Sequence, residues 1–270
     1  SGASMIIIPI TFLIFYGLVM IVLWNSSKEV IGFRYLLSSA VAECQVMIQY
    51  GLLNGIAILT KSPLINTASR KWMHLWIVWA WFNYCFHMPL IAWSRLHAIY
   101  APHSFRGQRQ WMSYGICVVF AWLLSFIISA STQWQPWFVT FYFEPAAYGL
   151  LAEDFIKYQR DGEAQIYLGI HIFVVVLPIV FYSATIALLI KHRAFIASVK
   201  PEKGGNKKQS VESKLLVPCI LHTTIFVLGQ VAITIGTGSG PWATWTIAFI
   251  FFLNSALSPV LLVVFLPTLR

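Results

Sequence analysis

Seven long apolar runs restrict the fold of this sequence more than any other feature. Short polar stretches separate most of these runs. The runs lie at 5–24, 33–60, 72–99, 112–131, 165–190, 214–236 and 242–266. A helix needs about 20 mostly apolar residues to cross the hydrocarbon core of a bilayer. The sequence therefore predicts an all-α integral membrane protein, with a single seven-transmembrane-helix bundle over residues 1–270.

The composition excludes several other classes of protein. Hydrophobic residues make up 59% of the chain and charged residues only 10%, whereas soluble domains carry about 25% charged residues. A soluble enzyme, a disordered chain and a nucleic-acid-binding module are excluded on this ground. The cysteines all fall within apolar runs, which favours buried thiols over disulfides or a metal site; they are Cys44, Cys85, Cys117 and Cys219.

The distribution of charge predicts the orientation in the membrane. If the N-terminus is outside, most of the 18 Lys and Arg residues fall in inner loops, above all in 191–214. The outer loop 132–164 holds five of the nine acidic residues. Cytoplasmic loops of membrane proteins are enriched in Lys and Arg. We therefore predict an outer N-terminus and a cytoplasmic C-terminus, with the inner basic loops facing anionic membrane lipids.

Two motifs lie at the ends of the third and seventh runs. After the third run, Arg95, Ala98, Ile99 and Pro102 have the spacing of the D-R-Y-x-A-I-x-x-P signature. The seventh run contains Asn254-Ser255-Ala256-Leu257-Ser258-Pro259, which is similar to N-S-x-x-N-P. Weaker matches lie at Ala42-Glu43, Trp122 and Pro178. In this order, the motifs make the chain resemble a rhodopsin-like G-protein-coupled receptor.

Departures from that pattern narrow the resemblance. Ser94 replaces the acid beside the arginine, the usual extracellular cysteines are missing, and the sixth run lacks the C-W-x-P motif. In these respects the chain is similar to nematode serpentine chemoreceptors, most of all the Srg superfamily, with Srv as one candidate. The resemblance implies a plasma-membrane receptor, with the sensory cilium as one location, that binds an external ligand and activates a heterotrimeric G protein.

Arg95 is the predicted switch. A charged side chain in a membrane helix is costly unless it meets water, lipid phosphate or a partner. We expect it to be paired within the bundle at rest and released toward the G protein on activation; snorkelling to the surface is the alternative. Glu212 is the candidate resting partner, and a solvated loop acid is the other interpretation. The predicted coupling residues are Arg95, Pro102, Glu212, Asn254, Ser258 and Pro259.

Glu43 is the acid placed deep inside an apolar run. An ionisable residue within the membrane is a functional candidate because it is costly to keep there. We expect it to face Asn254 and Ser258 in a polar network that holds sodium or water. A protonated Glu43 bonded to one neighbour is the alternative.

The ligand pocket is predicted in the outer half of the bundle, between the third, fifth, sixth and seventh spans. Few charges and many aromatic rings favour a small, uncharged, odorant- or pheromone-like ligand. Core packing is the alternative interpretation for each of these side chains. The predicted pocket residues are His74, Ile77, Val78, Trp81, His171, Val174, Gln230 and Phe249.

Other functions fit the sequence less well. A retinal-binding protein needs a lysine in the seventh span for a Schiff base, and 242–266 contains none. Ser239 lies in a Gly- and Pro-rich turn and is an unconvincing nucleophile. We therefore predict neither an enzyme nor a cofactor. A transporter or channel for a small solute remains the alternative, although such proteins more often show repeats and several intramembrane charges.

Overall fold

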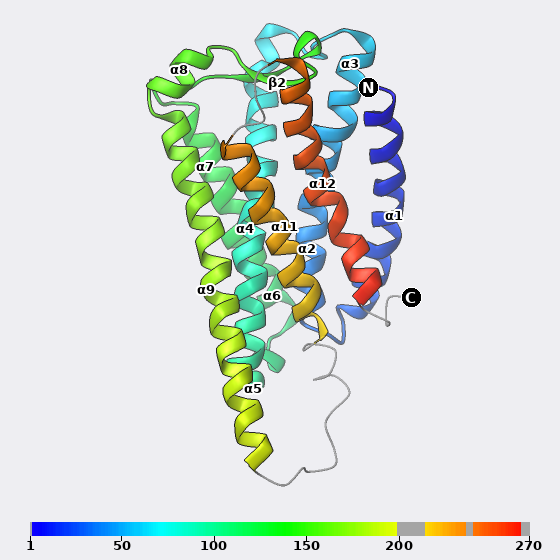
Figure 1. Ribbon diagram of the computed structural model, residues 1–270, viewed down its shortest axis with the longest axis vertical. Helices are drawn as coiled ribbons and strands as arrows, with labels where there is room; N and C mark the ends of the chain where they lie inside the picture. The colour runs from blue at the N-terminus through cyan, green and yellow to red at the C-terminus, as the bar shows by residue number, and fades with distance from the viewer. Residues whose placement is uncertain (1, 199–213, 236–239, 266–270) are drawn as a thin grey trace.

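The protein is a bundle of long helices (Figure 1), and the computed structural model describes residues 2–198, 214–235 and 240–265. The first two passages are α1 (Ser4–Ser26) and a continuous rod of α2 (Gly32–Val46), the π-helical η1 (Met47–Leu53) and α3 (Asn54–Thr60). The third is α4 (Arg70–Tyr100), preceded by the 3₁₀ turn η2 (Thr67–Ser69).

The remaining passages complete the bundle. The fourth is a rod of α6 (Gln110–Cys117), the π-helical η3 (Val118–Leu123) and α7 (Leu124–Thr132). The last three are α9 (Glu163–Ser198), α11 (Leu216–Ile235) and α12 (Pro241–Phe265). Six of the passages are long and apolar enough to cross a membrane, and α11 adds the shorter apolar stretch Leu216–Ala232. The predicted seven-helix class is confirmed.

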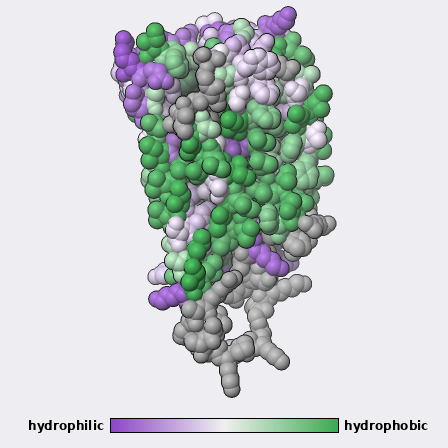
Figure 2. Space-filling model, in the orientation of Figure 1, coloured by the Kyte–Doolittle hydropathy of each residue, from purple (hydrophilic) through white to green (hydrophobic). Residues whose placement is uncertain are grey.

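The surface of the bundle is suited to lipid. Figure 2 shows a broad hydrophobic band across the middle of the visible face, with hydrophilic residues gathered above it and a few below it. Large apolar side chains on this surface are well exposed, among them Ile14 on α1, Ile127 on α7 and Leu228 on α11. A soluble monomer rarely exposes so large an apolar patch to water. The hydrocarbon core of a bilayer, in contrast, is a favourable environment for such a surface.

The centre of the bundle is α4. Its residues from Ala80 to Ala92 are all buried, and it packs against α2, α7, α9 and α11. Trp122 on η3 helps to seat it, because the indole Nε1 donates to Ser38 Oγ at 3.0 Å and His87 Nε2 lies 2.9 Å from the same hydroxyl. Pro178 and Pro259 lie inside α9 and α12, as the sequence indicates.

A close approach of two helices depends on glycine. A Cβ atom built on Gly55 would lie 2.6 Å from the backbone oxygen of Met5, and one built on Gly51 would lie 2.6 Å from Cγ of Pro9. Real Cβ atoms essentially never come so near a neighbour. These two glycines therefore allow α1 to pack directly on the C-terminal half of the second passage.

The sequence did not predict a small folded cap in the segment 132–164. Strands β1 (Phe141–Glu144) and β2 (Gly149–Ala152) form an antiparallel hairpin around the 3₁₀ turn η4 (Pro145–Ala147), and α8 (Phe155–Arg160) follows. Figure 1 shows the hairpin at the end of the bundle where α1 begins, while α12 ends toward the opposite end, where the short helix α5 (Pro102–Arg106) lies. The side of the membrane that each end faces stays a prediction.

Candidate functional site

Arg95 lies near the end of α4 and is only 1% exposed. Its Nε donates to Ser94 Oγ at 3.3 Å, and that hydroxyl in turn donates to the backbone oxygen of Ile91. The guanidinium is therefore held inside the bundle, and the snorkelling alternative does not describe this conformation. Glu212, the predicted resting partner, lies outside the described residues.

The chain turns sharply beyond Arg95. Pro102 occupies the first turn of α5, a favoured position because proline lacks the amide hydrogen that would there go unpaired. One turn later Phe105 is 2% exposed and packs against His97, with ring centroids 5.5 Å apart. The predicted motif thus forms a compact corner beside Arg95.

A second buried cation, Arg34, was not predicted to have a role. Its Nε donates to the backbone oxygen of Ser27 at 2.9 Å, and Nη1 donates to that of Gln108 at 3.0 Å. The hydroxyl of Tyr35 also donates to Gln108, at Oε1. These contacts connect the turn after α1 to the segment after α5. They therefore hold together two segments of the predicted inner face.

Glu43 lies at the centre of a buried polar group on three helices. Ser39 donates to Glu43 Oε1 at 2.7 Å, and the Tyr16 hydroxyl donates to Oε2. The Tyr16 oxygen is also 3.4 Å from Ser258 Oγ. The structure therefore brings Glu43 and Ser258 into one network, with Tyr16 of α1 as a bridge that the sequence did not reveal.

The contacts that the structure gives for Asn254 belong to a different group, and its predicted place beside Glu43 stays a prediction. Its side-chain amide packs against Gly229 of α11, where a Cβ atom would collide with it. Its backbone oxygen lies 3.3 Å from His222 Nε2, which is equally close to the Tyr84 hydroxyl. This second group connects α4, α11 and α12.

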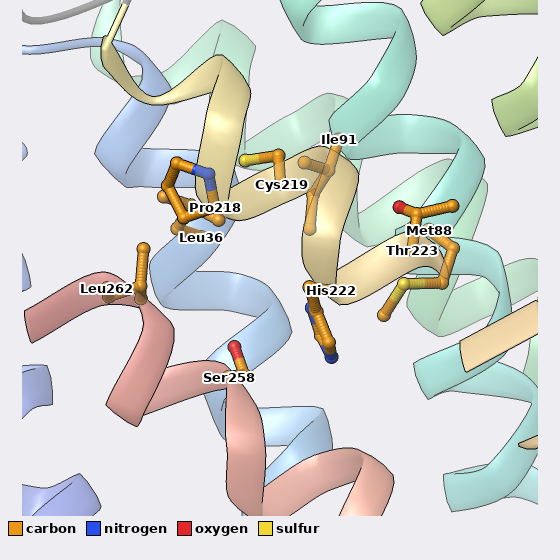
Figure 3. A pocket seen from close by; sticks show the side chains of 9 residues that line it. All are labelled: Leu36, Met88, Ile91, Pro218, Cys219, His222, Thr223, Ser258 and Leu262. Atoms are coloured by element: carbon orange, nitrogen blue, oxygen red, sulfur yellow. The ribbon is translucent and has the colours of Figure 1, made fainter. Parts of the chain in front are cut away.

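A small cavity lies beside both groups (Figure 3). The His222 ring and the Ser258 hydroxyl point into it, and its volume is about 10 Å³, which is close to the space needed by one water molecule. The lining residues are Leu36, Met88, Ile91, Pro218, Cys219, His222, Thr223, Ser258 and Leu262.

Trp81 is the centre of an aromatic cluster on the hairpin side of these groups. Its indole Nε1 donates to His171 Nε2 at 2.8 Å, and the Phe251 ring meets it edge-on with centroids 4.1 Å apart. Tyr50 and Phe226 pack around the same indole. The predicted third, fifth, sixth and seventh spans therefore do meet at Trp81.

Most of the other predicted pocket residues lie in the interior. Ile77, Val78, Val174 and Gln230 are all buried. No predicted pocket residue lines the small cavity beside Ser258 or a larger cavity at the hairpin end of the bundle. The side chains of the cluster fill this region by packing on one another.

Two of the predicted pocket residues have other contacts. His74 accepts a hydrogen bond from the backbone N–H of Phe141 at 2.9 Å and stacks on its ring, so it anchors the hairpin. Phe249 stacks on Trp245 instead of meeting Trp81. Residues two positions apart on a helix point about 200° apart, and the contact with Trp81 comes from Phe251.

Comparison with known proteins places these features in a family. The family model described as serpentine type 7TM GPCR chemoreceptor Srx matches residues 6–260. The crystal structure of squid rhodopsin superposes with a TM-score of 0.76 at 16% identity, covering 100% of this chain and 82% of the squid chain. At that identity the likeness shows the fold alone. No curated protein matches. The narrower resemblance to Srg or Srv is not confirmed.

Proposed function

Because this chain belongs to the Srx family of serpentine seven-transmembrane chemoreceptors, we propose that it binds a small external molecule and activates a heterotrimeric G protein. The family match over 6–260 carries this proposal. A family of receptors also argues against an enzyme. We place the receptor in the plasma membrane, with the sensory cilium as the proposed site, an outer N-terminus and basic inner loops on anionic lipid.

The proposed ligand site is the aromatic cluster around Trp81. The cluster offers aromatic faces and one polar pair, Trp81 with His171. The buried valines Val78 and Val174 lie about one helical turn from these two residues along α4 and α9. Such a surface favours a small, uncharged, odorant- or pheromone-like molecule. The side chains are in mutual contact, so a ligand that enters must change the packing of Trp81 on Phe251.

A chain of contacts leads from this cluster toward the other end of the bundle. Tyr84 packs on Trp81 with centroids 5.6 Å apart and lies 3.3 Å from His222. His222 and Ser258 line the same small cavity, and Ser258 adjoins Tyr16 and Glu43. Packed cores switch between discrete arrangements instead of deforming continuously. We propose that a change at Trp81 shifts this network and, through α4, releases Arg95.

Replacement of Arg95 tests the coupling. Cells that express the receptor and report Gα activation are screened with a library of uncharged volatile and pheromone-like compounds, and surface expression is measured by an N-terminal tag. Arg95→Ala is expected to reach the surface and to lose signalling. Arg109→Ala is the matched control, because Arg109 is exposed on the same inner segment, and it should respond normally.

Two outcomes would contradict the proposal. Wild-type responses from Arg95→Ala would remove the arginine from the switch. Compound-dependent uptake or current in the absence of Gα activation would favour the transporter or channel alternative instead.

A further inference from the structure

A second cavity opens at the hairpin end of the bundle, and no residue of the Trp81 cluster lines it. Its volume is about 520 Å³, within the range of about 300–1,000 Å³ that is usual for small-molecule pockets. It lies between the end of α3, the start of α4 and the tip of the hairpin. The lining residues are Ile58, Lys61, Pro63, Arg70, Glu144, Pro145, Ala146 and Tyr148. We call it the outer cleft.

Local backbone geometry shapes the outer cleft. The chain leaves α3 at Lys61 in the left-handed conformation, with φ of 54°, and it leaves η4 at Tyr148 with φ of 57°. Asn54 Nδ2 donates to the backbone oxygen of Tyr148 at 3.2 Å. This bond ties the hairpin tip to α3 and so connects two walls of the cleft.

The two cations that line the outer cleft, Lys61 and Arg70, can still bind an anion. Lys61 is exposed, and no acid of the described chain comes within ion-pair distance of it. The Arg70 guanidinium lies over the Tyr142 ring at 4.1 Å and reaches Glu153 at only 3.6 Å. Arg70 Nε is buried and finds no hydrogen-bond acceptor among the described residues, so an anion in the cleft would meet the other nitrogens of this side chain, which is 21% exposed.

The acid of the lining is already engaged. The Glu144 carboxylate accepts a hydrogen bond from the Ala146 backbone N–H at 3.2 Å and so caps η4. The remaining walls at Ile58, Pro63 and Pro145 are apolar. An incoming molecule therefore meets two cations and one capped carboxylate, Glu144, beside a short apolar surface.

We propose that the outer cleft is a binding site for a small organic carboxylate, distinct from the site at Trp81. The carboxylate bonds to Arg70 and Lys61, and a short hydrocarbon chain lies on Ile58 and the two prolines. Arginine suits this role because its planar group can present two donors to one carboxylate. The charge of this ligand separates it from the uncharged ligand of the proposed receptor site.

Direct binding tests the inference without any signalling step. The full chain is placed in nanodiscs of zwitterionic phosphatidylcholine, and binding is followed by saturation-transfer NMR. Pentanoate and pentanamide are the probes, because they share one shape and differ in charge. Pentanoate is expected to bind saturably and pentanamide to bind at least tenfold more weakly. Equal binding of the two probes, or no saturable binding of pentanoate, would overturn the proposal.

Variants locate the site. Lys61→Gln is expected to weaken pentanoate binding about fivefold, as loss of one partly exposed charge-assisted hydrogen bond implies. Lys71→Gln removes a charge from the same end of α4 outside the lining and should bind as the wild type does. Equal losses in both variants would mean nonspecific attraction and would refute the site.

The Glu144→Gln variant tests whether the cleft prefers an anion or a cation. It removes a negative charge from the lining, and the glutamine oxygen can still cap η4. Pentanoate binding is therefore expected to strengthen. Weaker pentanoate binding, together with pentylamine binding that the substitution abolishes, would identify a cation site and overturn the proposal.

Discussion

Tyr16→Phe is the most direct test of the network that joins α1, α2 and α12. The substitution removes one oxygen and keeps the ring. It deprives Glu43 Oε2 of its donor and Ser258 of its neighbour at 3.4 Å, while Ser39 still donates to Glu43 Oε1. The ring is 1% exposed, so water cannot readily replace the lost hydroxyl.

The expected cost follows from the number of groups left without partners. A hydrogen bond contributes about 0.5–1.5 kcal/mol net, and a buried acceptor without a partner costs about 1–3 kcal/mol. Side-chain hydrogen bonds in membrane proteins contribute about 0.6 kcal/mol on average and up to about 1.7. Loss of one hydrogen bond and of the donor to one buried oxygen therefore lowers the free energy of unfolding by about 1–2 kcal/mol. For a chain of this size, that change lowers Tm by about 2–8 °C.

The measurement is thermal unfolding of the purified receptor in nanodiscs at a fixed heating rate. Tyr100→Phe is the control, because Tyr100 is 75% exposed and the described residues offer it no hydrogen-bond partner. It should melt with the wild type. If Tyr16→Phe melts within 1 °C of Tyr100→Phe, the hydroxyl does not stabilise the bundle and the network is not energetically coupled through it.

Two further pairs of substitutions test the packing. Phe251→Ala should abolish the response to an agonist found in the library screen and Phe249→Ala should preserve it, because only Phe251 meets the centre of the aromatic cluster; the reverse result, read as Gα activation, would move the ligand site. Gly55→Ala should lower Tm by several degrees, since its Cβ would lie 2.6 Å from the Met5 oxygen. Gly17→Ala has open space at the Cβ and should leave Tm unchanged or raise it, so a matching loss in both variants would contradict the argument.

The helices were predictable because the membrane imposes their length and composition. Apolar runs show where a helix must satisfy its backbone internally, but they do not show where it ends. The fifth predicted run stops at residue 190, and α9 continues to Ser198. Lys191, His192 and Arg193 interrupt the apolar run, yet Lys and Arg are good helix formers. Helix α9 therefore extends beyond the apolar run from which it was predicted.

The hairpin left a weaker trace in the sequence. Its strands have four residues each, too few for an alternating pattern to be recognised with assurance. The contacts of His74 could not be predicted without it, because they depend on the backbone of Phe141. His74 shares a helical face with Trp81, but its contacts are with the hairpin.

The rotation of a helix decides which of its residues meet a site, and α12 shows why sequence alone does not give that rotation. Its residues from Thr246 to Leu253 are all apolar except the first, so no polar face marks the side that turns toward the interior of the bundle. Phe249 and Phe251 are equally acceptable by composition. Close packing chooses between them: the Asn254 amide lies against Gly229, the one place on the adjoining turn of α11 without a side chain. With that contact fixed, a 3.6-residue helix turns Phe251 toward Trp81 and Phe249 away from it.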